Sequence, residues 1–268
     1  MKKGMFLLAL IVMIASMPAM TFASADVNTQ EPEICSVEEF KTELNRFNAD
    51  GRLSTAEKNY LMQNTEEEVV CDFVGEKLDD AVDFLNDASK NHHLMALEDG
   101  QEYKCETYDL GDGCQLIVEL EDRAEDVTGN MNVRATSGSN TLWKGYGNRY
   151  FTASAKVAFS LGSATLKLRN HYTLSSKGID ERYGVESFIV GTVDGTISAT
   201  EPVITDATAR TVGASDVNME CKFTLKYSDE YGYSMKKQYV MESKVGFVDI
   251  DKAGEQVKVK QSWTLTRI

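Results

Sequence analysis

The chain has 268 residues and a formal net charge of −14, and this length predicts one large or two small domains. Residues 26–130 hold 28 acidic against 8 basic residues, whereas residues 131–268 hold 14 against 18. The acidic first half repels phosphate groups, which excludes nucleic acid and anionic lipid as its partners. The change of charge predicts two parts.

Residues 1–25 have the pattern of a secretory signal peptide. A short basic start precedes an apolar run over residues 6–15, and a small-residue cleavage pattern ends at Ala23 or Ala25. The apolar run is short for a membrane span, and Pro18 interrupts its end. No lipid-anchor, wall-sorting or later spanning pattern follows. We therefore expect an extracellular protein with no anchor and no stable membrane insertion.

Residues 26–100 are predicted to be an acidic helical region. Apolar side chains at spacings of three and four predict helices over 36–47, 55–63 and 66–89, which would form a small bundle. Two capping boxes are expected at helix starts, at Ser36 with Glu39 and at Thr65 with Glu68. The third helix carries a longer apolar seam, which comprises Cys71, Val74, Leu78, Ala81 and Leu85.

Residues 46–57 resemble the calcium-binding loop of an EF-hand. Arg46 stands where that family places its first anionic ligand, and a guanidinium has no acceptor. The alternative is structural: a glycine turn ends one helix and a capping box starts the next. We favour the structural interpretation and expect no metal or other cofactor. The positions that match the family pattern are Asn48, Asp50, Gly51, Leu53, Ser54 and Glu57.

From residue 101 the apolar spacing changes to two, which indicates strands. Residues 101–122 predict a β-hairpin around Gly111-Asp112-Gly113, and residues 123–140 predict a linker. Residues 141–268 contain about seven alternating segments, which predict an antiparallel β-sandwich because each apolar face needs a partner sheet. The expected fold class is therefore α+β with segregated parts. This layout resembles that of secreted proteins of Gram-positive bacteria.

All five cysteines lie beyond the signal peptide. Cys105 and Cys114 flank the hairpin turn, and Cys35 and Cys71 could tie the first helix to the third. Both pairs are disulfide candidates in an oxidising compartment, although spacing alone does not select the pairing. Cys221 lies on the apolar face of a strand, which predicts a buried thiol.

No catalytic signature is present, so we expect a non-catalytic protein. The sequence lacks the hydrolase, zinc-protease and phosphate-loop motifs. His171 alternates outward on a strand. Both tryptophans and eight of the eleven tyrosines lie beyond residue 140, and several fall in predicted loops. Aromatic loop residues often bind proteins or sugars, and the candidate binding residues are Trp143, Tyr146, Tyr150, Tyr231 and Tyr233.

Three functional classes follow. The favoured one is a secreted binding protein that uses these aromatic loops to contact a protein or a glycan. The alternative is a secreted pore-forming or toxin-like protein, because long alternating segments such as 150–175 resemble strands of membrane barrels. The third is a hydrolase that lacks a recognisable signature. The competing structural role for Trp143 and Tyr150 is to cap the end of the core.

Overall fold

A computed structural model describes residues 33–48, 53–87, 91–97, 101–125, 141–191, 196–228 and 234–268. The chain divides into two compact units, Met1–Glu31 and Pro32–Ile268. The predicted signal peptide and residues 126–140 of the predicted linker lie outside the described residues. Helices and strands belong to the same compact unit, so the expected division at residue 100 does not separate two compact units.

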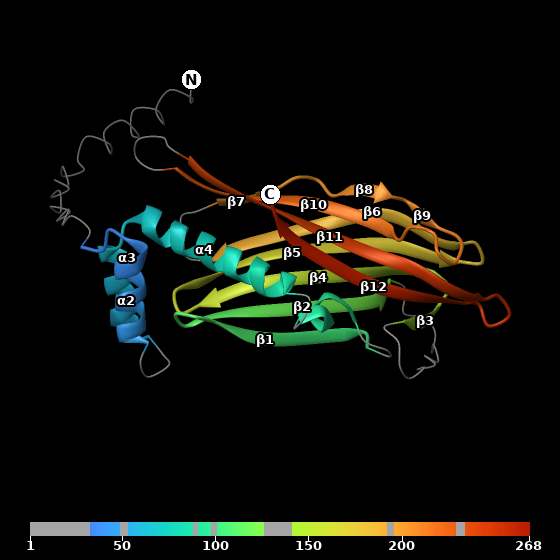
Figure 1. Ribbon diagram of the computed structural model, residues 1–268, viewed down its shortest axis with the longest axis horizontal. Helices are drawn as coiled ribbons and strands as arrows, with labels where there is room; N and C mark the ends of the chain where they lie inside the picture. The colour runs from blue at the N-terminus through green and yellow to red at the C-terminus, as the bar shows by residue number, and fades with distance from the viewer. Residues whose placement is uncertain are drawn as a thin grey trace, which may run out of the picture. The chain divides into compact units, whose positions relative to one another are not determined.

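The N-terminal helices precede the strands, which confirms a mixed α+β protein (Figure 1). The helices are α2 (Val37–Phe47), α3 (Thr55–Asn64), α4 (Glu67–Asn86) and the short 3₁₀ helix η1 (His92–Met95). The strands are β1 (Tyr103–Gly111), β2 (Cys114–Ala124), β3 (Leu142–Gly145), β4 (Gly147–Phe159), β5 (Gly162–Ser175), β6 (Gly178–Gly191), β7 (Thr196–Ala199), β8 (Val203–Asp206), β9 (Thr208–Ala209), β10 (Val217–Ser228), β11 (Ser234–Asp251) and β12 (Gln256–Arg267). Among the described helices, none is long and apolar enough to cross a membrane.

Serine side chains cap the N-termini of two helices. Ser36 accepts from the backbone N–H of Glu39 at the start of α2. Ser54 and Glu57 form a complete capping box at the start of α3. The box expected at Thr65 is wrong, because α4 begins after Glu66 without a side-chain cap. Thr65 instead ends α3 in an extended conformation, and its backbone pairs with that of Ile34.

The strands form two six-stranded antiparallel sheets. The first has the order β1-β2-β4-β5-β6-β9, and the second has the order β3-β12-β11-β10-β7, with β8 paired to β10. The predicted hairpin exists, but β2 also pairs with β4 from Gln115 to Ala124, so the hairpin is one edge of the first sheet. Within the described part of 141–268 we find ten strands rather than about seven, partly because 202–212 contains two short strands.

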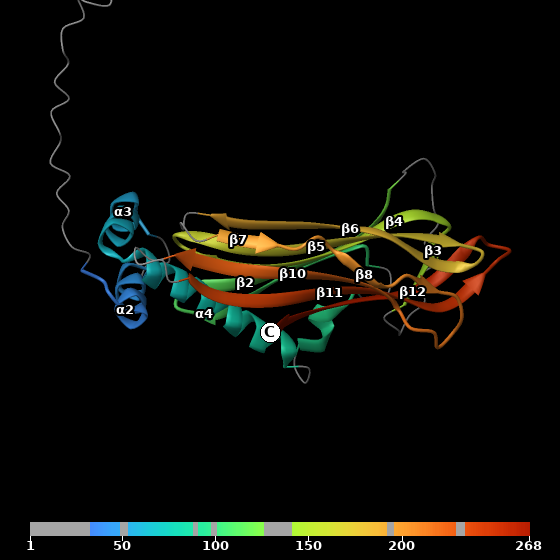
Figure 2. The ribbon, with the colours of Figure 1, turned by 90° about the horizontal axis from the view of Figure 1, so that it is seen from above.

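One hydrophobic core joins both sheets to α4. Leu78 and Leu85 of α4 pack in the same cluster as Leu116 of β2 and Trp263 of β12. Figure 2 shows α4 along one side of the strands, with α2 and α3 at one end. The seam that was expected to hold the helical bundle together therefore mostly faces the sheets. A second, smaller cluster includes Phe40, Leu44, Leu61 and Phe73, with Cys114 of β2 and Leu161 of the turn between β4 and β5.

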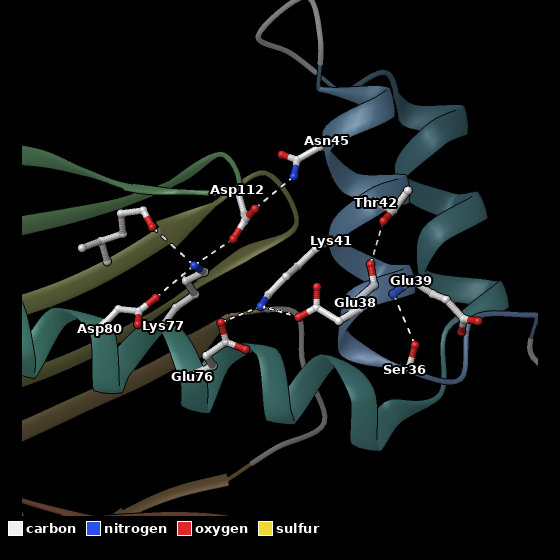
Figure 3. A network of polar contacts seen from close by, with 11 residues as sticks. Ser36, Glu38, Glu39, Lys41, Thr42, Asn45, Glu76, Lys77, Asp80 and Asp112 are labelled. Carbon is white, nitrogen blue, oxygen red and sulfur yellow. Dashed lines mark hydrogen bonds and ion pairs between the residues drawn. The ribbon is translucent and has the colours of Figure 1, made fainter.

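Polar contacts attach the helices to the turn between β1 and β2. Nζ of Lys77, on α4, lies 2.9 Å from Asp112 Oδ2 and 3.0 Å from Asp80 Oδ2. Asn45, on α2, donates to the other oxygen of Asp112 at 3.0 Å (Figure 3). Lys41 bridges α2 to α4 through Glu76 at 2.6 Å. The ion pairs raise the pKa of Lys77 although burial alone would lower it.

The strand register rules out the predicted Cys105–Cys114 disulfide. Cys105 lies opposite Glu119, and Cys114 lies opposite Gly111. Five residue positions of β2 separate Cys114 from Glu119, about 16 Å of strand, whereas bonded cysteines need Cα atoms within about 7 Å. Cys221 is buried, as expected. The Cys35–Cys71 link stays a prediction.

Candidate binding surface on the first sheet

The predicted aromatic residues do not form one site. Trp143 is half-buried in β3, opposite Lys258 of β12. Tyr146 packs against the core, which favours a structural role for it. Tyr150 lies half-buried on β4. Tyr231 and Tyr233 lie outside the described residues.

Tyr150 belongs to a row of rings that crosses three neighbouring strands. The register places Tyr150 of β4 opposite His171 of β5, and His171 opposite Tyr183 of β6. The His171 and Tyr183 rings are stacked, with centroids 4.2 Å apart and planes at 15°. The Tyr150 and His171 centroids are 5.8 Å apart. Cross-strand neighbours of this kind are the contacts that sheet pairing dictates.

A guanidinium group lies over each end of this row. Cζ of Arg169 lies 4.3 Å from the Tyr150 ring centroid, and Cζ of Arg182 lies 5.2 Å from that of Tyr183. Such cation–π contacts are attractive because the ring face is electron-rich. We call the five side chains, Arg169, Tyr150, His171, Tyr183 and Arg182, the aromatic–cation row.

Glu125, just after β2, holds two members of the row in place. Its two carboxylate oxygens lie 2.5 Å from His171 Nδ1 and 2.5 Å from Arg182 Nη1. Burial alone would raise the pKa of Glu125, but the hydrogen bonds from His171 and Arg182 lower it below its ordinary value. The row is therefore positioned before any ligand arrives.

The row faces away from the core. Leu168 and Tyr172 alternate with Arg169 and His171 along β5, and both point into the core cluster. Tyr183 keeps 46% of its surface exposed, although His171 beneath it keeps 7%. The same face also carries Lys156 of β4 and Lys167 of β5, both half-buried.

Beyond β6 the row leads into a groove of about 630 Å³. Arg182 and Tyr183 belong to both features. The groove is also lined by Glu186 on β6 and by the segment at the start of β8, where Val203 and Ile204 are exposed. An extended ligand on the row can therefore continue past the edge of the first sheet.

The side chains that match the calcium-loop pattern and are described contact other groups of the protein. The Glu57 carboxylate accepts from the Ser54 backbone N–H at 2.7 Å, and the Asn48 side chain accepts from Ser160 at 3.3 Å. Arg46 pairs with Glu43 at 2.5 Å. Asp50 lies outside the described residues. The described part of the chain contains no group of three or more His, Cys, Asp or Glu side chains that could hold a metal ion.

A second polar cluster lies inside the protein. Asp122 is fully buried and contacts Lys144 Nζ at 2.8 Å, Arg149 Nη2 at 2.9 Å and Tyr172 Oη at 2.8 Å. Gln261 of β12 donates to that tyrosine oxygen at 2.8 Å, so the cluster links both sheets. These groups satisfy one another, and we assign the cluster a structural role.

The sequence indicated part of the row and missed the rest. Alternation placed His171 outward, and Tyr150 was a candidate binding residue. Arg169, Tyr183 and Arg182 were missed, because only the register shows which residues of separate strands are neighbours. The irregularity in pairing between His171 and Tyr172 shifts the alignment of β6 by one residue.

Comparison with known proteins gives no match: no family model fits the chain, and no characterised protein or solved structure is significantly similar to it.

Proposed function

We propose that this chain is a secreted, non-catalytic binding protein whose two sheets form a β-sandwich scaffold for the aromatic–cation row. The observation that carries the proposal is the row itself. Five cationic or aromatic side chains from β4, β5 and β6 contact one another in sequence on the sheet face that the core does not use. Tyrosine and arginine, together with tryptophan, are enriched among the residues that dominate binding energy at interfaces.

The rigidity of the row supports binding rather than a role as a loose surface. Glu125 fixes His171 and Arg182, and each ring restrains its neighbour, so little side-chain freedom is lost when a ligand binds. The signal peptide pattern at residues 1–25 supports export, where polysaccharides and surface proteins are the accessible ligands.

Alanine substitution tests the proposal against immobilised polysaccharides, both neutral and charged. We expect Tyr183→Ala to weaken binding by about tenfold or more, while its melting temperature stays within a few degrees of the unmodified chain. Tyr103→Ala is the matched control, because Tyr103 is an exposed tyrosine on β1 of the same sheet. Equal binding by Tyr183→Ala and the unmodified chain would refute the proposal.

A further inference from the structure

The ring faces of the row are already occupied. Tyr183 has His171 stacked on it and Arg182 over it, and Tyr150 has Arg169 over its ring. A sugar ring therefore has little aromatic face on which to stack. The groups left for a ligand are ring edges, tyrosine hydroxyls and guanidinium N–H groups.

The guanidinium groups retain donors for a ligand. Each has five N–H groups. The described hydrogen bonds use Nε of Arg169, which donates to Thr152 at 3.0 Å, and Nη1 of Arg182, which donates to Glu125. Arg169 Nη2 also lies 4.0 Å from Glu121. A planar carboxylate accepts two parallel N–H bonds from such a group.

The charge around the row favours an anion of low charge density. Lys156 and Lys167 add positive charge on β4 and β5. Glu119 and Glu121 add negative charge on β2, the strand that pairs with β4 on the side away from β5. The whole chain carries −14. A densely charged polymer such as nucleic acid is repelled by that net charge, whereas a polymer with few carboxylates meets the local cations at lower cost.

The spacing of the row suits a linear ligand. Arg169 and Arg182 lie over opposite ends of a row that covers three strands. Neighbouring strands are about 4.8 Å apart, so the two ends are on the order of 10 Å apart. From these features we infer that the row binds a linear polysaccharide with carboxylate groups, and that Arg169 and Arg182 each receive one carboxylate. This inference rests on the proposed function.

The test compares the full chain with four soluble polymers by calorimetry. Hyaluronate carries a carboxylate on every second sugar, polygalacturonate carries one on every sugar, dextran is neutral, and single-stranded DNA is a dense polyanion. We expect hyaluronate to bind most tightly and polygalacturonate to bind more weakly, because its charge is denser. Dextran and single-stranded DNA should not bind, and the binding of both carboxylated polysaccharides should weaken as salt is raised.

Substitutions assign the carboxylate contacts. We expect Arg169→Gln and Arg182→Gln each to weaken hyaluronate binding by about tenfold, because each removes a charge-assisted hydrogen-bonded pair. Arg169→Lys keeps the positive charge but loses the planar pair of N–H donors, so this variant should bind hyaluronate at an intermediate strength. Lys222→Gln on β10 of the second sheet is the control and should bind normally. Circular dichroism confirms that each variant is folded.

The outcomes separate this inference from the proposed function. Dextran binding as tight as hyaluronate binding, lost in Tyr183→Ala but kept in both glutamine variants, overturns the carboxylate inference and leaves the proposed function standing. Tighter binding of single-stranded DNA also overturns the inference. If no polymer binds, or if no substitution in the row changes binding, both the inference and the proposed function are wrong.

Discussion

Two carboxylates in the interior, Asp122 and Glu181, have opposite surroundings. Burial alone would raise the pKa of Asp122, but Arg149 and Lys144 lower it below its ordinary value. Glu181 forms no ion pair among the described residues, and only the Asn170 side chain partly offsets the effect of its burial. Burial raises the pKa of Glu181 to about 8. The protein therefore keeps one buried acid charged and the other neutral at neutral pH.

The raised pKa of Glu181 predicts that the stability of the fold falls as pH rises. The folded chain holds this proton more tightly than the unfolded chain, whose pKa is near 4.5. The unfolding free energy should fall between about pH 4.5 and pH 8, by on the order of 5 kcal/mol at about 1.4 kcal/mol per pH unit. Glu181→Gln should remove this dependence and unfold at higher urea than the unmodified chain at pH 8.5. Glu201→Gln, an exposed control, should not.

The environment of Asp122 predicts the opposite pH dependence of stability. Its lowered pKa adds stability that is present at neutral pH and is lost as pH falls through the folded value. Asp122→Asn leaves Lys144 and Arg149 buried without their main counter-ion, so it should cost about 3–5 kcal/mol in urea unfolding. Asp180→Asn is the matched control, because Asp180 and Arg210 form a half-exposed pair that should be worth under about 1 kcal/mol. Similar losses for both variants would contradict this account.

Among the elements, α4 connects the acidic helices to the sheets. One side of it contributes Leu78 and Leu85 to the sheet core. Asp79 on the same helix accepts from Tyr239 at 2.9 Å and pairs with Lys237 and Arg267 at 2.9 Å each. The helix is therefore attached to β11 and β12 by apolar packing and by charge.

This attachment predicts that helix and sheets unfold together. Leu78→Ala should destabilise the protein by about 2–5 kcal/mol, because it opens a cavity in the shared core. The tryptophan fluorescence, which comes from Trp143 and buried Trp263, and the helical circular dichroism should both shift to lower urea, with one midpoint. Met62→Ala, at an exposed position on α3, is the control. A helical transition separate from that of Trp263 would show that the bundle is independent.

The start of α3 gives a prediction about calcium. Because the Glu57 carboxylate caps the helix, millimolar calcium should leave the melting temperature nearly unchanged. Glu57→Ala should cost about 1 kcal/mol whether or not calcium is present, as the loss of a cap does. A calcium-dependent rise of several degrees that Glu57→Gln abolishes would restore the ion-binding interpretation.

At the scale of the whole molecule, the compact unit extends from Pro32 to Ile268. Residues 141–268 on their own would lack β2, which pairs with β4 along most of its length, and α4, which covers the core. We expect this fragment not to fold cooperatively, because it would expose an unpaired strand and a large apolar surface. Residues 32–268 should fold. A sharp urea transition of the fragment 141–268 would contradict this prediction.

By itself, the sequence determined the features that depend on near neighbours along the chain. Spacing and capping chemistry predict the helix starts at Ser36 and Ser54, the turn at Gly111 to Gly113, and the inward direction of Cys221. These features are local because hydrogen bonds near a helix end or within a tight turn involve residues a few positions apart.

Only the tertiary structure decided which distant residues meet. Strand register places Tyr150, His171 and Tyr183 in one row, and it separates Cys105 from Cys114. Alternation gives the face on which a side chain lies but not its neighbours on other strands, since sliding a strand by two residues preserves the pattern. The partner of the α4 seam was ambiguous for a related reason: an apolar stripe needs burial, and both a helix and a sheet can supply it.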